Sequence, residues 1–134
     1  MKRWEIDAVG RQNLKLNDVE VPKPGPKEVL IKVNAVALNY RDKMVVETGR
    51  GLPLTFPFTP GSDLAGEVVG LGQGASRLSI GTGSRTALER FVRAIDQTRI
   101  VPVVNSCYSL ADLPAAFDHL DRGAFGKIVI DVAE

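Results

Sequence analysis

Residues 68–84 read VVGLGQGASRLSIGTGS and place five glycines directly after an apolar run. Within them, Gly70-x-Gly72-x-x-Ala75 has the spacing of a dinucleotide-binding loop, in which the backbone approaches a pyrophosphate closely. Such a loop works only where a strand turns directly into a helix, because the free N–H groups at the helix start face the phosphate. Residues 76–83 hold two more glycines and no helical apolar stripe. The stretch therefore predicts a glycine-rich corner between strands rather than a pyrophosphate site.

After this stretch the pattern of apolar residues becomes helical. Apolar positions at i, i+3, i+4 and i+7 predict a helix over residues 86–97, with a stripe formed by Leu88, Phe91, Val92 and Ile95. The remaining segments predict a strand, a helix and a buried strand over residues 99–110, 109–123 and 127–132. In the second helix, Ser109 and Asp112 resemble a capping box, although Pro114 could move the start to Asp112, and Gly123 is a natural stop.

Before the glycines the chain predicts strands separated by proline and glycine corners. Short strands are expected over residues 2–7 and 14–21, the second from its alternation of apolar and polar residues. Residues 28–39, EVLIKVNAVALN, are apolar on both faces and predict a central strand that is covered on both sides. Asn39 then caps a single helical turn that ends at Gly49. Residues 52–61 form a surface loop and residues 62–72 a returning strand, so the whole pattern indicates an α+β chain.

Composition limits the class of protein. The chain has 134 residues, 44% of them hydrophobic and 25% charged, with a formal net charge of +1, which suits one compact domain. The mixed charges give no indication of nucleic-acid or membrane-surface binding. No apolar run is long enough to span a bilayer. A single cysteine excludes an internal disulfide framework and indicates a reducing, cytoplasmic setting.

Three blocks of the sequence resemble the medium-chain dehydrogenase/reductase superfamily, in its zinc-free alcohol dehydrogenase and quinone oxidoreductase-like branch. They are VPKPGPKEVLIKVNAVALNYRD (21–42), FPFTPGSDLAGEVVGLGQGASR (56–77), and GSRTALERFVRAI (83–95) together with AFDHLDRGAFGKIVIDV (116–132). In that superfamily the first two blocks build a GroES-like catalytic domain. A Rossmann domain is inserted after them, and the chain then returns to the catalytic domain. The resemblance thus implies an α+β fold: a partial GroES-like β-barrel with two or three helices.

The chain departs from this superfamily in length, because members are more than twice as long. The second and third blocks are almost fused here, with the join around Leu78 and Ser79. The resemblance therefore implies a GroES-like segment over residues 1–78 and a C-terminal segment over residues 79–134 that packs back on it as one compact domain. The Rossmann domain, including the true glycine-rich loop, is expected to be missing.

The positions that bind metal in zinc-using relatives carry other residues here. Asn39 stands at the cysteine position, and Ser62 and Asp63 stand where those relatives have a His-Glu pair. Cys107 and His119 are the only other soft ligands, too few for a zinc site. No metal is expected. Cys107 is expected to be a small, partly buried thiol, with a nucleophilic role as the alternative, and His119 a solvated surface residue.

The resemblance also names candidate site residues in the turn Asn39-Tyr40-Arg41-Asp42. Asn39 would hydrogen-bond the substrate carbonyl or the nicotinamide region, Tyr40 and Arg41 would offer a proton donor or a phosphate contact, and Asp42 would orient them. Lys127 stands where relatives place a basic contact to the cofactor pyrophosphate. The alternatives are structural: Asn39 as a cap only, Asp42 paired with Arg41 or Lys43, and Lys127 as an ordinary lysine before a buried strand.

Two functions follow from these expectations. The first is the catalytic-domain remnant of a zinc-independent, NAD(P)H-linked oxidoreductase acting on a small carbonyl or alcohol, inactive alone because no cofactor is expected to bind this chain by itself. The second is a non-catalytic GroES-like protein-interaction module. An incomplete barrel has open sheet edges that pair readily with another chain. Two outcomes are therefore expected as alternatives: the helix over residues 86–97 folds back on the remaining sheet, or the chain forms a homodimer through those edges.

Overall fold

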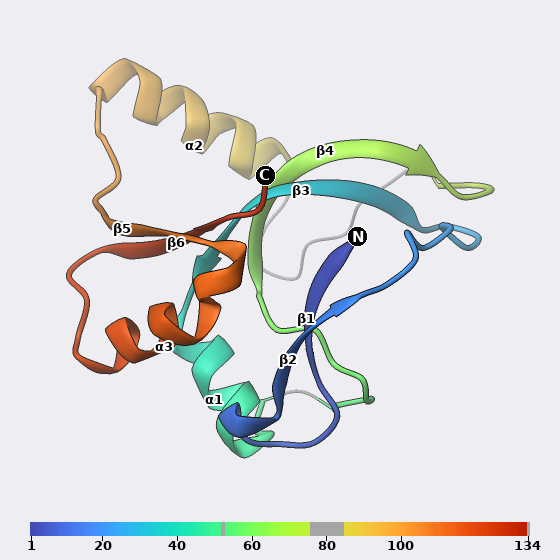
Figure 1. The fold of residues 1–134 in the computed structure, drawn as a ribbon. Coiled ribbons are helices and arrows are strands. Elements are labelled where there is room, and N and C mark those ends of the chain that lie inside the picture. The colour runs from blue at the N-terminus through green and yellow to red at the C-terminus, as the bar shows by residue number, and fades with distance from the viewer. Residues whose placement is uncertain (52, 76–84, 134) are drawn as a thin grey trace.

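The computed structural model of the protein describes residues 1–51, 53–75 and 85–133, and Figure 1 shows its ribbon. The expected join at Leu78 and Ser79, and with it the boundary between the two segments, lies outside the described residues.

A four-stranded sheet of order β4-β3-β6-β5 forms the frame of the molecule. Its strands are β3 (Val29–Leu38), β4 (Asp63–Leu71), β5 (Val104–Ser109) and β6 (Lys127–Asp131). β3 pairs antiparallel with both β4 and β6, while β5 runs parallel to β6. The predicted central strand is therefore confirmed, although most of its side chains are half-buried rather than covered on both sides. The expected strands over residues 99–110 and 127–132 are shorter than predicted.

A separate antiparallel pair, β1 (Lys2–Ile6) and β2 (Leu14–Asp18), is joined by the short 3-10 helix η1 (Arg11–Asn13). One of its contacts with the rest of the chain is made by Ile6, whose backbone exchanges hydrogen bonds of 2.9 and 3.0 Å with Phe58. The described strands thus form two open sheets with helices beside them, and these strands do not close into a barrel. This arrangement is the α+β fold that the sequence predicts.

The helices are α1 (Tyr40–Thr48), α2 (Arg85–Thr98) and α3 (Leu113–Asp121), the last preceded by the 3-10 helix η2 (Leu110–Asp112). The prediction of a single turn after Asn39 was wrong, because α1 continues for nine residues before Gly49 ends it with φ 68°. A left-handed residue at this position is the ordinary helix stop, and glycine adopts it without steric cost.

The core lies where α1 and α3 cover the sheet, at the lower part of Figure 1. Its buried side chains come from both ends of the chain: Ile6, Leu38, Val46, Leu113, Ala116, Phe117, Ile128 and Ile130. β6 lies between β3 and β5 and carries Ile128 and Ile130 into this core. The C-terminal residues are therefore part of the same packed unit as the N-terminal ones.

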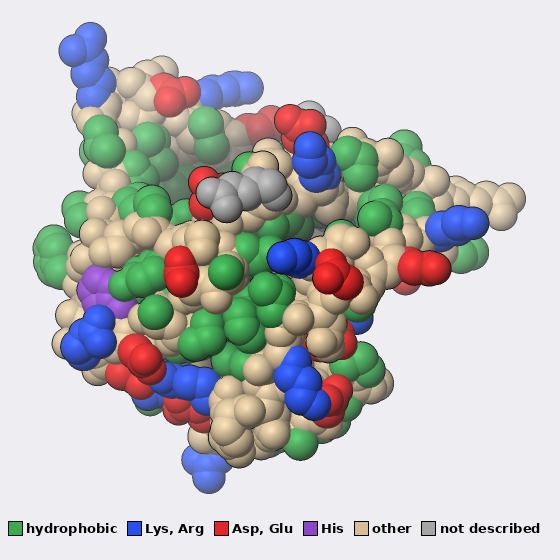
Figure 2. Space-filling view, in the orientation of Figure 1, with side chains coloured by type: hydrophobic (Ala, Val, Ile, Leu, Met, Phe, Trp, Pro, Cys, Tyr) green, Lys and Arg blue, Asp and Glu red, His purple; other side chains and the backbone are tan. Residues whose placement is uncertain are grey.

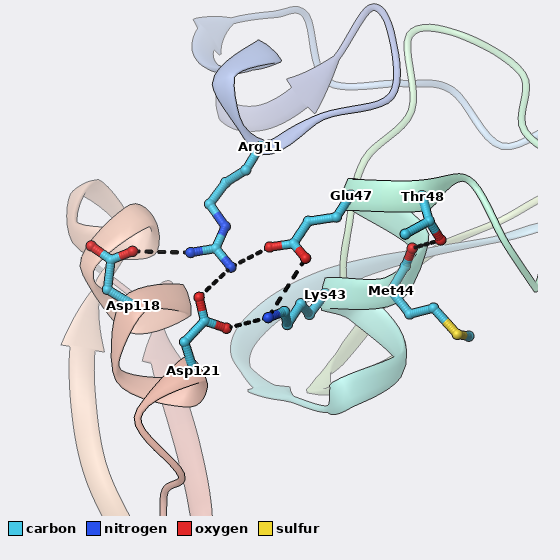
Figure 3. A network of polar contacts seen from close by, with 7 residues as sticks. All are labelled: Arg11, Lys43, Met44, Glu47, Thr48, Asp118 and Asp121. Carbon is cyan, nitrogen blue, oxygen red and sulfur yellow. Dashed lines mark hydrogen bonds and ion pairs between the residues drawn. The ribbon is translucent and has the colours of Figure 1, made fainter.

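A charged network links three elements on the surface of this core (Figure 3). Arg11 of η1 forms ion pairs with Glu47 of α1 and with Asp118 and Asp121 of α3, the last two at 3.0 and 2.9 Å. Lys43 of α1 pairs with Asp121 at 2.6 Å. The guanidinium of Arg11 also lies 5.3 Å from the centre of the Phe117 ring. The network therefore fixes η1 and α1 against the C-terminal helix.

Helix α2 stands apart from this core, at the upper left of Figure 1. Leu88, Phe91 and Val92 of its apolar stripe are 54, 62 and 47% exposed. The expectation that this helix covers its stripe by folding back on the sheet is therefore wrong. None of the helices in the described part of the chain is both long enough and apolar enough to cross a membrane.

Candidate functional site

Asn39 lies at the junction between β3 and α1, where the chain leaves the sheet and begins a helix. Its backbone is extended, and its N–H donates to Oδ2 of Asp42 at 2.7 Å, while the Asp42 N–H donates to the Asn39 carbonyl at 3.0 Å. Asp42 is only 4% exposed. A buried carboxylate that accepts a charge-assisted hydrogen bond fixes the backbone of its neighbour firmly, so Asp42 holds Asn39 in place.

The side chain of Asn39 is the centre of a polar cluster formed by Asn39, Ser62, Asp63 and Lys127. Its Nδ2 lies 2.9 Å from Oδ2 of Asp63 and 3.3 Å from Oγ of Ser62. Nζ of Lys127 donates to Oδ1 of Asn39 at 2.5 Å and lies 3.5 Å from Oδ2 of Asp63. Three elements meet here, since Asp63 begins β4 and Lys127 begins β6. The cluster is accessible, with the Lys127 and Asp63 side chains 46 and 57% exposed.

Tyr40 and Arg41, the other two residues of the turn, take no part in the hydrogen bonds given above for the cluster. Tyr40 is 72% exposed. Arg41 is exposed and lines a small cavity of about 30 Å³ with Asp42, Pro60 and Ser62. Asp42 forms its hydrogen bond with the backbone of Asn39, while Lys43 pairs with Asp121 and Glu47. The structure thus brings Asn39, Asp42 and Lys127 together, puts Arg41 beside them, and leaves Tyr40 in solvent.

The glycine-rich loop does not have the geometry that a pyrophosphate needs. The N–H of Gly72 donates to the carbonyl of Glu28 at 2.9 Å, and that of Lys27 donates to the carbonyl of Gln73 at 2.9 Å. A Cβ on Gly72 would lie 1.7 Å from the Gly25 carbonyl oxygen, so only glycine fits against that turn. Residues 70–75 therefore form a corner beside the end of β4, and the rest of the predicted strand-to-strand corner, residues 76–84, lies outside the described residues.

A nicotinamide dinucleotide accordingly does not fit the described residues alone. Lys127 and Arg41 are cations near the cluster, but Lys127 already contacts Asn39 and Asp63. The described part of the chain holds no strand-to-helix glycine turn that would supply the remaining phosphate contacts. It also contains no group of three or more His, Cys, Asp or Glu residues arranged to hold a metal ion.

Two expectations about single residues were wrong. Cys107 is exposed rather than partly buried, because it lies on β5 at the edge of the sheet. His119 is half-buried rather than solvated, and its Nδ1 lies 2.9 Å from the Tyr108 hydroxyl. The cluster itself was missed: Ser62 and Asp63 drew attention only as replacements for metal ligands. Their contacts with Asn39, and the contact of Asp63 with Lys127, depend on the order of the strands, which the local pattern does not reveal.

Comparison with known proteins relates the sequence of the chain to one family. Residues 25–109 match the model of the alcohol dehydrogenase GroES-like domain. The chain is 46% identical over 67 residues to the chloroplastic quinone-oxidoreductase QR1 of Triphysaria versicolor, a match that covers 48% of this chain and 20% of that protein. It is 45% identical over 65 residues to a zinc-type alcohol dehydrogenase-like protein of Schizosaccharomyces pombe, covering 48% of this chain and 19% of that one.

Solved structures agree with this match. The human synaptic vesicle membrane protein VAT-1 homolog-like protein superposes with a TM-score of 0.83 at 14% identity, covering 100% of this chain and 99% of that one, which shows a shared fold. A mycobacterial quinone oxidoreductase superposes with a TM-score of 0.51 at 31% identity, covering 62% of this chain and 26% of that one.

The matching part spans about a fifth of the length of the first curated relatives. Within this chain, the family model covers more than half of the residues, and it includes both Asn39 and Asp63 of the polar cluster. The protein therefore belongs to the alcohol dehydrogenase GroES-like domain family, within the medium-chain dehydrogenases and reductases.

Proposed function

We propose that this chain is the substrate-side, catalytic-domain part of a zinc-independent oxidoreductase that acts on a small carbonyl or alcohol with NAD(P)H, and that it does not turn over alone. The observation that carries the proposal is the polar cluster. Asn39, Ser62 and Asp63 stand at positions that bind zinc in some relatives by resemblance, and the Asn39 side chain is hydrogen-bonded to Ser62, to Asp63 and to Lys127. The cluster thus offers hydroxyl, carboxylate and amide groups and a lysine, where zinc prefers soft ligands such as cysteine and histidine.

The cluster is suited to binding a carbonyl oxygen. The Asn39 amide and the Lys127 ammonium are both hydrogen-bond donors, and they lie within one hydrogen bond of each other on an accessible surface. A substrate oxygen would replace one of these exposed contacts, while Asp42 keeps the Asn39 backbone fixed. Asn39 and Lys127 are therefore proposed to bind and polarise the carbonyl, and Asp42 is proposed to position Asn39. The residues 1–51, 53–75 and 85–133 do not complete a dinucleotide site, which is why the chain alone is proposed to be inactive.

A titration of NADPH with the purified chain, followed by nicotinamide fluorescence, tests the inactivity. We expect no saturable binding in the micromolar range. Saturable binding that is lost in Lys127→Ala but retained in Lys23→Gln, an exposed lysine away from the cluster, would show a complete cofactor site and contradict the proposal.

Zinc independence has its own test. Dialysis against zinc followed by elemental analysis is expected to leave less than one zinc per chain. One bound zinc that disappears in both Asn39→Ala and Asp63→Ala would show that the cluster is a metal site and would overturn this part of the proposal.

A second candidate function is a non-catalytic interaction module that forms a homodimer through its open sheet edges. It is favoured by the unusual exposure of β4, whose Leu64, Val68 and Leu71 are 54, 58 and 67% exposed. Large exposed apolar surfaces typically mark interaction sites. For either function we propose a cytoplasmic location, where a reducing environment preserves the exposed thiol of Cys107.

A further inference from the structure

An apolar cavity of about 790 Å³ opens between β1 and the four-stranded sheet. Trp4 of β1, Leu30 and Val33 of β3, and Leu113 of α3 are among the residues that line it. Figure 2 shows apolar side chains exposed to solvent at the centre of this face of the molecule. The cavity is distinct from the polar cluster, since Asn39, Ser62, Asp63 and Lys127 do not line it.

The size of the cavity fits a small organic molecule. Ligand pockets in proteins usually have volumes of roughly 300–1,000 Å³ and walls that are mostly apolar. Two of the polar side chains in the wall already have partners. The Trp4 indole N–H donates to the Leu110 carbonyl at 2.6 Å, and Arg3 pairs with Glu5 at 2.6 Å. An occupant is therefore offered a long apolar surface and few hydrogen-bonding groups.

The charged residues that line the wall within the described ranges have one sign. They are Lys2, Arg3 and Lys32, and no described Asp or Glu lines the cavity. Lys2 and Lys32 form no ion pair with any residue of the described ranges, unlike Arg3. A lysine ammonium beside apolar surface attracts an anion whose remaining part is apolar. The wall thus complements a molecule with a long alkyl chain and a single negative end.

We propose that this cavity binds a single-chain carboxylate of the fatty-acid type, with the alkyl chain against β3 and Leu113 and the carboxylate at Lys2 and Lys32. The proposal does not depend on the oxidoreductase function. It concerns a different surface, and its failure would leave the polar cluster and its tests unchanged.

Isothermal titration with dodecanoate and with dodecanol, below the concentrations at which they aggregate, tests the proposal. Dodecanoate is expected to bind more tightly to the wild type than dodecanol. Lys2→Gln and Lys32→Gln should each weaken dodecanoate binding about two- to fivefold, the range for an exposed charge pair, and should leave dodecanol binding unchanged. Lys23→Gln removes an exposed charge that does not line the cavity and should change neither affinity.

A matched pair of variants on β4 tests the location. Val69 lines the cavity and is 54% exposed, while its neighbour Val68 is 58% exposed and does not line it. Val69→Glu should abolish binding of both probes, because it puts a negative charge into the apolar wall, and Val68→Glu should preserve both. Circular dichroism confirms that each variant folds.

Three results would overturn the proposal. They are equal affinities for dodecanoate and dodecanol, equal effects of the two valine variants, and a dimer that forms at the titration concentration and excludes both probes. The last result would show that a second copy of the chain covers the cavity instead.

Discussion

Asn39 shows at the scale of one residue what a sequence reveals and what it conceals. Its cap and the stop at Gly49 were predicted, because both depend on side chains and backbone angles within a few positions. Its hydrogen bond to Lys127 was not predicted, because the two residues are 88 positions apart and meet only through the pairing of β3 with β6. Their joint site role stays a prediction, supported by the short contact between them.

Asp42 permits a direct test of how this residue is held. Replacing Asp42 with Ala removes a buried carboxylate that accepts the Asn39 N–H. We expect the free energy of unfolding to fall by about 1 kcal/mol, the typical loss for a helix-start cap. Urea denaturation of the variant measures this loss, with Asp96→Ala on exposed α2 as the control. An unchanged midpoint for Asp42→Ala would mean that the contact does not anchor the turn.

Helices α2 and α3 show the same limit at the scale of elements. Apolar spacing predicted both helices, and both exist. The spacing did not predict which helix buries its apolar stripe, because burial depends on the other elements that pack against the helix. Phe117 of α3 is 0% exposed within the core, whereas Phe91 of α2 is 62% exposed. One sequence pattern thus corresponds to a buried helix and to an uncovered one.

The two phenylalanines make a matched comparison. Phe117→Ala should lower the free energy of unfolding by about 3–5 kcal/mol, because it leaves a cavity in the core. Phe91→Ala should change it by no more than about 0.5 kcal/mol, as at other exposed sites. Urea unfolding curves recorded at low protein concentration measure both values. A loss for Phe91→Ala that approaches the loss for Phe117→Ala would show that the stripe of α2 is covered in solution.

The network between η1, α1 and α3 gives a prediction about pH (Figure 3). The pKa of Asp121 lies below its ordinary value of 3.8, first because Lys43 donates a hydrogen bond to it and then because Arg11 does. A carboxyl group with a depressed pKa stabilises the fold above the pKa it has when unfolded, and this contribution is lost as the pH falls through the folded pKa. The network should therefore weaken in acid.

Asp121→Asn isolates this effect. Between about pH 6 and pH 3, a range that includes the ordinary pKa of Asp, the wild type should lose more free energy of unfolding than the variant does. Urea denaturation curves recorded at several pH values across this range measure the free energy of unfolding of both proteins. Asp96→Asn, on the exposed helix α2, is the control and should follow the wild type. Parallel curves for Asp121→Asn and the wild type would contradict a stabilising role for the ion pairs.

The whole molecule depends on the order of its strands, which the sequence alone did not reveal. Strand positions followed from alternation and from turn residues, and most were found within a few residues. The insertion of β6 between β3 and β5 depends on pairing between distant segments. This insertion brings Lys127 to Asn39 and also places β4 and β5 at the two edges of the described sheet. The polar cluster and the exposed edges are therefore consequences of one topology.

The edge at β4 leads to a prediction about assembly. β4 pairs only with β3 among the described strands, and an exposed apolar edge strand readily pairs with another chain. We expect light scattering during size-exclusion chromatography to show a dimer that gains population as the protein concentration rises. Val68→Lys should shift the protein toward the monomer, because lysines on edge strands oppose pairing. Val101→Lys, at a residue that is 82% exposed and outside every strand, is the control. If the wild type is monomeric at every concentration, or if both variants act alike, β4 is not the interface; the apolar stripe of α2 would then be the next surface to substitute.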